Sequence, residues 1–173
     1  MTDALLTPRQ TWVHLLVWCP AQTSHTPDPD LWWPRVLQVT RGEEAGPPGV
    51  VLRPGEPIQR AAERVAGALG ITLPPPPLRL LAVDQQPAEA GQLEELGLVL
   101  DGGCLAADAL PPCACGGHNG SDRAGHHELT WTPVGELGRV TLIQALRTLL
   151  LELQPTLLWQ GLPVPRGHAG SAR

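Results

Sequence analysis

The segment from Val51 to Thr72, VLRPGEPIQRAAERVAGALGIT, constrains the fold more than any other part of the chain. Its apolar residues recur at spacings of three and four, which places them on one face of a helix. They are Ile58, Ala61, Ala62, Val65 and Leu69. Pro57 is favoured in the first turn of a helix, and Gly70 is favoured just after the last turn. The pattern therefore predicts a helix over Pro57–Leu69, with Val65 facing the core and Glu63 facing solvent.

Short apolar runs rich in β-branched residues surround this segment and predict strands. They are 11–19, 35–40, 50–52, LRLLAVDQQP, LGLVLDGG and ELTWTPVGEL, the last of which leads into a turn. The run VTLIQALRTLLLEL near the C-terminus predicts a second amphipathic helix, and RGEEAGPPG predicts a loop. These elements, without an internal repeat, indicate an α+β fold: an α/β/α sandwich with a mixed β-sheet and two main helices.

The 173 residues, 42% of them hydrophobic, suit one domain with a core of useful size. We expect this domain to span 11–160 after an N-terminal tail at 1–10, and to hold the helix segment in a region at 49–71. The Cys-, His- and Gly-rich stretch 104–127 predicts an irregular loop. The end of the chain, 161–173, has little to bury and predicts a mobile tail.

Charge and composition argue against several classes of function. The formal net charge is −5 and the arginines form no stripe, so we do not expect binding to polymeric nucleic acid. The apolar run TWVHLLVWCPA is too short to span a membrane, which indicates a strand of a cytoplasmic protein with reduced cysteines. Lys, Phe and Tyr, which have AT-rich codons, are absent, as is typical of a high-GC bacterium.

Glu56 and Arg64 stand at the separation found in a known catalytic motif, with AA and GI in typical positions beside them. In this respect the chain resembles the Nudix hydrolases. Their signature is Gly, five residues, Glu, seven residues, Arg-Glu-aliphatic, one residue, Glu-Glu, one residue, Gly-aliphatic. The order of the flanking strands also matches, so the resemblance spans roughly Thr11 to Leu153. It implies a Nudix-like sandwich and magnesium-dependent cleavage of nucleoside diphosphate-linked substrates.

The chain departs from this signature at the positions that hold magnesium in the family. Val50 stands where the glycine belongs, Val65 replaces the Glu after Arg64, and residues of GAL replace the Glu-Glu pair. Mg²⁺ requires oxygen ligands, which these side chains lack. The resemblance further implies that Glu56 and Arg64 brace the loop against the helix by a charge-assisted hydrogen bond. We therefore interpret the segment as a degenerate Nudix box that keeps its structural brace.

Several acidic residues remain candidates for a relocated magnesium site. Glu56 and Glu63 are the candidates for both metal binding and catalysis within the box. Glu94, Glu95 or Asp101 would approach from a neighbouring loop and strand. The alternative is that Glu63 is solvated and Glu56 is paired with arginine, because charged residues on helices are usually exposed.

The segment CACGGH places Cys113, Cys115 and His118 close together, with Cys104, His126 and His127 nearby in sequence. Zinc sites usually have two or more residues between paired cysteines, whereas Cys113 and Cys115 are separated by one. We therefore expect no zinc here and a structural or accidental role for these thiols, with a zinc site as the alternative.

The tryptophans offer a surface for a ligand. Trp32 and Trp33 follow a proline-rich loop and are candidates for stacking on a base or ring, with Arg53 as a further ligand-binding candidate. The alternative for every tryptophan is packing, and we expect Trp12 and Trp18 to fill the core or its edge.

The leading functional hypothesis is a Nudix-fold protein that binds a nucleotide or nucleoside diphosphate derivative with weak or no hydrolysis. The first alternative is an active magnesium-dependent Nudix pyrophosphohydrolase whose acidic ligands are relocated. The second is a protein-interaction module that uses the proline-rich loops. Magnesium is a candidate cofactor, required by the active-hydrolase alternative, and the sequence leaves the oligomeric state open.

Overall fold

The computed structural model describes residues 9–21, 33–41, 44–88, 93–106, 108–109 and 127–164 of the chain. The strands and helices follow in the order β1 (Arg9–Cys19), β2 (Arg35–Arg41), β3 (Glu44–Gly46), β4 (Gly49–Val51), α1 (Ile58–Leu69), β5 (Leu80–Gln86), β6 (Glu94–Cys104), β7 (His127–Pro133), a short 3-10 helix (Val134–Glu136), α2 (Val140–Leu150), β8 (Thr156–Trp159) and β9 (Leu162–Pro163). Within these ranges, no helix is long and apolar enough to cross a membrane.

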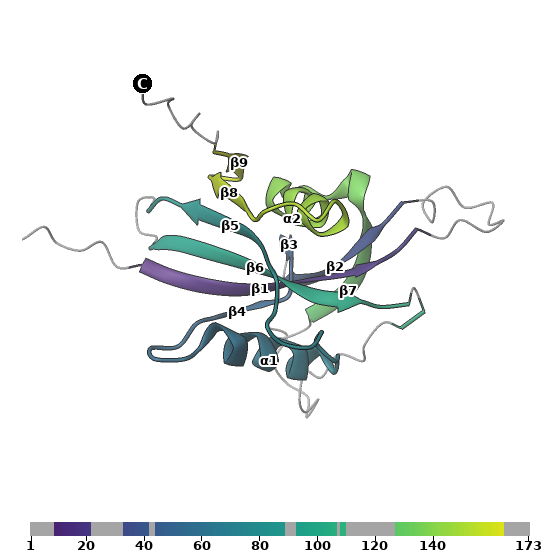
Figure 1. Ribbon diagram of the computed structural model, residues 1–173, viewed down its shortest axis with the longest axis horizontal. Helices are drawn as coiled ribbons and strands as arrows, with labels where there is room; N and C mark the ends of the chain where they lie inside the picture. Colours follow the sequence, from purple (N-terminus) through teal and green to yellow (C-terminus); the bar gives the residue numbers. More distant parts are fainter. Residues whose placement is uncertain are drawn as a thin grey trace, which may run out of the picture.

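The strands form a mixed sheet that separates the two helices (Figure 1). The hydrogen-bonded order is β3-β2-β1-β6-β5-β8-β9, with β4 also paired to β1 and β7 to β2. The β1–β6 and β5–β8 pairs are parallel, whereas the β1–β4 and β5–β6 pairs are antiparallel. Helix α1 covers one face of the sheet and α2 covers part of the other. The α+β sandwich with two main helices is therefore confirmed.

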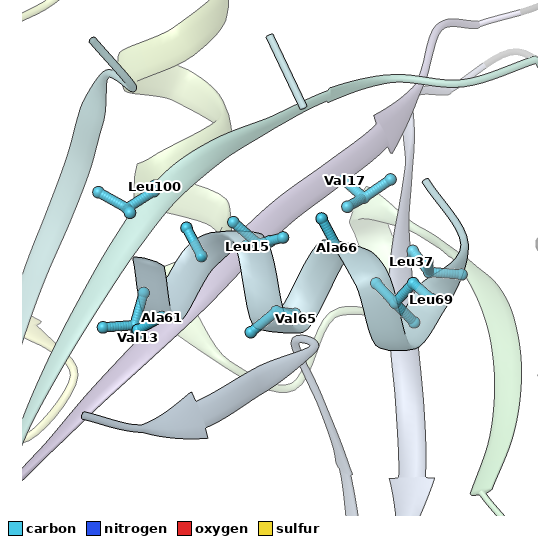
Figure 2. Packing of buried hydrophobic residues seen from close by; sticks show 10 residues of the cluster. Val13, Leu15, Val17, Leu37, Ala61, Val65, Ala66, Leu69 and Leu100 are labelled. Carbon is cyan, nitrogen blue, oxygen red and sulfur yellow. The ribbon is translucent and has the colours of Figure 1, made fainter. Parts of the chain in front are cut away.

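Strand β1 supplies the core on both faces because successive side chains of a strand point to opposite sides. Val13, Leu15 and Val17 pack beneath α1 in a buried cluster (Figure 2). Leu16, by contrast, belongs to the cluster beneath α2. The apolar run that indicated a strand therefore contributes side chains to both buried clusters.

Helix α1 forms where the three-and-four spacing placed it. Val65 is 3% exposed and Glu63 is exposed, as predicted. Gly70 adopts a left-handed conformation with φ of 71°, and the N–H of the next residue, Ile71, bonds to the Ala66 carbonyl. The prediction was wrong for Ile58, which is the first residue of α1, is 42% exposed and lies outside both buried clusters.

Three short strands lie where the sequence predicted none. β3 forms in the expected loop RGEEAGPPG by pairing with β2, and β8 and β9 form a hairpin after α2. β9 pairs with β8 inside the segment predicted as a mobile tail, and β1 begins at Arg9, inside the predicted N-terminal tail. Strands β1 and β9 therefore reach past the two expected boundaries, because short edge strands take their stability from a neighbour rather than from their own sequence.

Helix α2 ends at Leu150, three residues before the apolar pattern does. The guanidinium group of Arg79 donates to the carbonyl oxygens of Thr148 at 2.8 Å and Leu153 at 3.0 Å. It adds side-chain donors at the C-terminal end of α2, where the Thr148 carbonyl also accepts from the backbone N–H of Leu153. This arrangement also holds the chain where it turns into β8.

Candidate functional site

The loop before α1 is held by a two-point ion pair. Arg64 donates from Nε to Glu56 Oε1 at 2.7 Å and from Nη2 to Oε2 at 2.8 Å. Nη2 also bonds to the Val51 carbonyl at 2.9 Å, and the backbone N–H of Arg53 donates to Glu56 at 3.0 Å. The Arg64 hydrogen bonds, followed by that of Arg53, lower the pKa of Glu56 from 4.5 to about 2. Both carboxylate oxygens of Glu56 are therefore engaged by donors within the box.

The positions of the missing signature carboxylates are filled by apolar packing. Val65 and Leu69 are 3% and 7% exposed and contact the sheet residues drawn with them in Figure 2. Ala68 is exposed and has no group that binds a metal. Glu63 is exposed and pairs with Arg60 at 2.9 Å. Val65, Ala68 and Leu69 therefore offer none of the oxygen ligands that Mg²⁺ requires.

The principal cavity lies on the opposite face of the sheet and has a volume of about 500 Å³. Its floor consists of residues from three adjacent strands, among them Trp12 and His14 of β1, Gly97 of β6 and Asp84 of β5. Its walls are the first turn of α2 and the turn between β8 and β9. A volume of this size falls within the range of small-molecule sites.

A second cavity of about 220 Å³ adjoins the first one. The two share the lining residues Trp12, His14, Pro47, Glu95 and Arg139. The smaller cavity continues to Gly46 of β3 and Gly49 of β4, the strand that begins the box. Together they form one cleft, which runs from the β8–β9 turn to the first strand of the box segment.

Asp84 organises the inner end of this cleft. It is 9% exposed and is the one acidic or basic side chain classed as buried among the described residues. Its Oδ2 accepts hydrogen bonds from Thr141 Oγ1 at 2.6 Å and Gln86 Nε2 at 2.9 Å. Its Oδ1 accepts from the backbone N–H of Gly161 at 3.0 Å. Asp84 thereby ties β5 to the start of α2 and to the β8–β9 turn.

The aromatic part of the cleft is a stacked pair. The rings of Trp12 and His14 lie 5.7 Å apart between centroids, with an interplanar angle of 5°. Gly49 makes room for this pair, because a Cβ atom at that position would collide with the His14 ring. Trp12 Nε1 is buried and has no hydrogen-bond partner among the residues the structure describes. The indole ring therefore lines the cleft, while its N–H is enclosed.

The start of α2 supplies the positive side of the cleft. Arg139 is its N-cap residue, and neither a side-chain cap nor an acidic residue of the first turn offsets the positive end of the helix dipole. The guanidinium group of Arg139 lies 3.6 Å from the place a Cβ of Gly46 would take. It forms no hydrogen bond or ion pair with another residue of the described ranges. It is therefore available to a ligand.

No protein-family model and no curated protein matches the sequence. Solved structures do match the fold. A mutT/nudix family protein from Listeria innocua aligns with a TM-score of 0.58 at 17% identity, covering 83% of this chain and 95% of that one. The NUDIX domain of Shewanella oneidensis NrtR, solved with ADP ribose, aligns with a TM-score of 0.53 at 12% identity, covering 83% and 89%. A MutT protein from Methanosarcina mazei Go1 aligns with a TM-score of 0.53 at 19% identity, covering 86% and 99%.

The chain has the Nudix fold. This confirms the fold that was expected from the spacing of Glu56 and Arg64 and from the order of the flanking strands. At these identities the likeness concerns the fold alone, so the chemistry has to be argued from the residues of this chain.

Most site residues chosen from the sequence lie outside the cleft of this Nudix fold. Glu56, Glu63 and Arg53 line neither of its cavities. Trp33 is 61% exposed and also lines neither cavity, and Trp32 lies outside the described residues. The structure does bring Glu56 and Arg64 together. It places Glu63 apart from them, in its own surface ion pair with Arg60.

The other acidic candidates are also separated from one another. Glu95 lines both cavities, whereas Glu94 is bonded to Arg9 and Gln85. Asp101 accepts a hydrogen bond from the backbone N–H of Gly103 at 2.9 Å. Of the Cys and His candidates, Cys104 is the exposed last residue of β6, while Cys113, Cys115, His118 and His126 lie outside the described residues. His127 begins β7.

Sequence reasoning missed the residues that form the cleft. His14, Asp84, Gly97 and Arg139 were not selected, and Trp12 was expected to pack in the core or at its edge. A signal was available, because polar or small residues interrupt three apolar strand runs at His14, Asp84 and Gly97. Their common location was not predictable, since it depends on which strands are neighbours and in which register they pair.

Proposed function

We propose that the protein binds a nucleotide or another nucleoside diphosphate derivative in the cleft and hydrolyses it weakly or not at all. The observation that carries this proposal is the cleft itself. Its larger cavity of about 500 Å³ is lined by Trp12, by the buried Asp84 and by Arg139, whose guanidinium group lies beside Gly46 in the adjoining smaller cavity. Such a combination suits a ligand with both a flat ring and an anionic group.

The anionic group of the ligand is assigned to the side of Arg139. The side chain of Arg139 lines both cavities, and it stands at the N-terminus of α2, where backbone N–H groups favour negative charge. An arginine presents two parallel donors to phosphate, which makes the contact stronger than one to a neutral donor. A diphosphate would therefore extend from the larger cavity toward Gly46 and Gly49.

The ring of the ligand is assigned to the floor beside Trp12. Aromatic faces bind bases by stacking with little dependence on the particular base. The indole of Trp12 lines both cavities, so a flat ring placed there meets an aromatic surface.

Weak or absent hydrolysis is supported by the composition of the box. The carboxylate of Glu56 is occupied by Arg64 and the Arg53 backbone, and the helix face at Val65 and Leu69 is buried. Magnesium between carboxylates and substrate phosphates would offset the charge that develops during cleavage. The box segment offers no pair of free carboxylates for this role.

Calorimetric titration with ADP and ADP-ribose tests the binding. We expect saturable binding, with thermal stabilisation that grows with ligand concentration, about 2.7 kcal/mol at one hundred times the dissociation constant. Arg139→Ala should weaken binding by roughly 10-fold, because a charge-assisted hydrogen bond is lost. Arg147→Ala is the matched control, since Arg147 is an exposed arginine of the same helix that lines neither cavity.

Absence of saturable binding to either compound would overturn the proposal. So would equal losses of affinity in the Arg139→Ala and Arg147→Ala variants, since a general loss of charge would then explain the effect. Release of phosphate or nucleotide should be followed with and without Mg²⁺. Turnover at typical enzyme rates, of order 1 to 10³ per second, would replace the binding function by an enzymatic one.

One observation favours that second candidate, an active hydrolase with relocated ligands. Glu95 is an exposed carboxylate that lines both cavities together with Arg139, on the path assigned to the phosphates. A single carboxylate together with ligand phosphates can hold Mg²⁺. If this candidate is correct, Glu95→Gln abolishes Mg²⁺-dependent turnover, whereas Glu94→Gln, on the adjacent residue, retains it.

A further inference from the structure

Three residues form a row across the floor of the cleft. Trp12 of β1 pairs in register with Gly97 of β6, and Gly97 pairs with Asp84 of β5. All three line the larger cavity, so they present their side chains, or the lack of one, to the same face of the sheet. Neighbouring strands lie about 4.8 Å apart, which puts the Cα atoms of Trp12 and Asp84 about 10 Å from each other.

Gly97, in the middle of the row, is not required by the packing of the protein. A Cβ atom built there would lie 3.6 Å from the Asp84 carbonyl oxygen and 3.7 Å from His14 Cδ2, which are ordinary contacts. Its φ also lies outside the left-handed region that would require glycine. A side chain at position 97 would instead occupy the floor of the cavity. The glycine therefore leaves a gap between an indole ring and a carboxylate, bordered on one side by the His14 ring.

Asp84, at the end of the row, keeps part of its hydrogen-bonding capacity. A carboxylate has about four acceptor positions, two on each oxygen. Thr141 and Gln86 use both positions on Oδ2, whereas Gly161 uses one position on Oδ1. All three donors are neutral. A buried carboxylate supported only by neutral donors gains from a further donor, and Oδ1 has one acceptor position left for it.

We infer that this row recognises a flat heterocycle that carries an exocyclic amino group, as adenine, guanine and cytosine do. The ring lies over Gly97 beside Trp12, and the amino group donates to Oδ1 of Asp84. A carbonyl group at the same place would bring its lone pairs against the carboxylate, so the row disfavours rings that lack the amino group. This inference rests on the nucleotide binding proposed above and names the part of the nucleotide that is selected.

The test compares nucleotides that differ by one amino group. ADP is paired with purine riboside 5′-diphosphate, and GDP is paired with inosine 5′-diphosphate. We expect the amino-bearing member to bind roughly 10- to 100-fold more tightly in at least one pair, the range for a hydrogen bond to a charged group. In Asp84→Asn, which keeps the shape of the side chain, that preference should fall below about 3-fold. Thermal unfolding of the variant confirms that it is folded.

A second variant tests the open floor without touching Asp84. Gly97→Val should weaken binding of ADP and GDP by more than 10-fold and leave inorganic pyrophosphate binding unchanged, since pyrophosphate has no ring. Gly67→Val, at a position with no neighbour within 4 Å on the exposed side of α1, is the matched control and should leave all affinities unchanged.

The outcomes separate this inference from the proposed function. If the nucleotides bind but both pairs show equal affinities, the amino recognition is wrong and the nucleotide site stands. An amino preference that persists in Asp84→Asn, or a Gly97→Val variant that binds ADP and GDP like the wild type, also overturns the inference. If none of the nucleotides binds, both proposals fall.

Discussion

The two faces of strand β1 differ in how completely they are covered. On the α1 side, Val13, Leu15 and Val17 are fully buried beneath the helix of the box. On the α2 side, Leu16 is buried, but Trp12 and His14 line a cleft. α2 packs most closely on β5, so the first half of β1 is left open on this face. The difference shows that apolar packing has closed the segment that resembles a catalytic motif, while the polar groups are gathered on the other face.

A carboxylate on the α1 face should destabilise the protein. Val65→Glu restores the residue that follows the arginine in the Nudix signature, but it places a charge in a site that is 3% exposed. We expect a loss of about 3–5 kcal/mol in the free energy of unfolding, because a buried charge would lack a partner. Denaturant titration measures this loss.

Ala68→Glu is the matched control on the same helix, since Ala68 is exposed, and it should change stability by no more than about 0.5 kcal/mol. If Val65→Glu folds as stably as the wild type and binds Mg²⁺, the contrast between a closed face and an open one is wrong.

On the α2 face, a side chain at position 49 should disturb the aromatic pair of Trp12 and His14. Gly49→Ala would push a methyl group into the His14 ring, which stacks on Trp12. We expect a loss of about 1–3 kcal/mol, typical of overpacking, together with a change in tryptophan fluorescence. Nucleotide affinity should fall in parallel, because both rings line the cleft.

Gly67→Ala is the control for the glycine change itself. Position 67 lies in the interior of α1 and has no neighbour within 4 Å, so alanine should stabilise the protein by about 0.5–1 kcal/mol. A Gly49→Ala variant with unchanged stability and fluorescence would show that the aromatic pair does not depend on Gly49.

The smallest expected effect concerns the brace of the box and its dependence on pH. The pKa of Glu56 is about 2 in the folded protein, against an ordinary value of 4.5, chiefly because of its hydrogen bonds with Arg64. Glu56 therefore contributes fully to stability above about pH 4.5, and the contribution is lost as the pH falls through about 2.

Between these values, the free energy of unfolding should fall more steeply with decreasing pH in the wild type than in Glu56→Gln. Chemical unfolding at a series of pH values measures both curves. Parallel curves would show that the Glu56–Arg64 pair does not stabilise the fold.

The sequence by itself determined the elements whose signals are local. The three-and-four spacing in 58–69 set helix α1 and the orientation of Val65, because an amphipathic pattern has one low-energy placement against a core. The spacing of Glu56 and Arg64 anticipated a contact that the structure contains, because a short loop and one helix bring the two side chains together. The Nudix fold followed from these signals and from the order of the strands.

The tertiary structure alone decided where the polar groups meet. Trp12, Gly97 and Asp84 are far apart in the chain and share a floor only because β6 lies between β1 and β5 in one register. A shift of one residue in either pairing would send one of these side chains to the α1 face, since strand side chains alternate with a period of two. β8 and β9 likewise carry no strong signal of their own and form because β5 offers an edge to pair with. Register and strand order are long-range properties, and for this reason the box could be recognised from the sequence while the cleft could not.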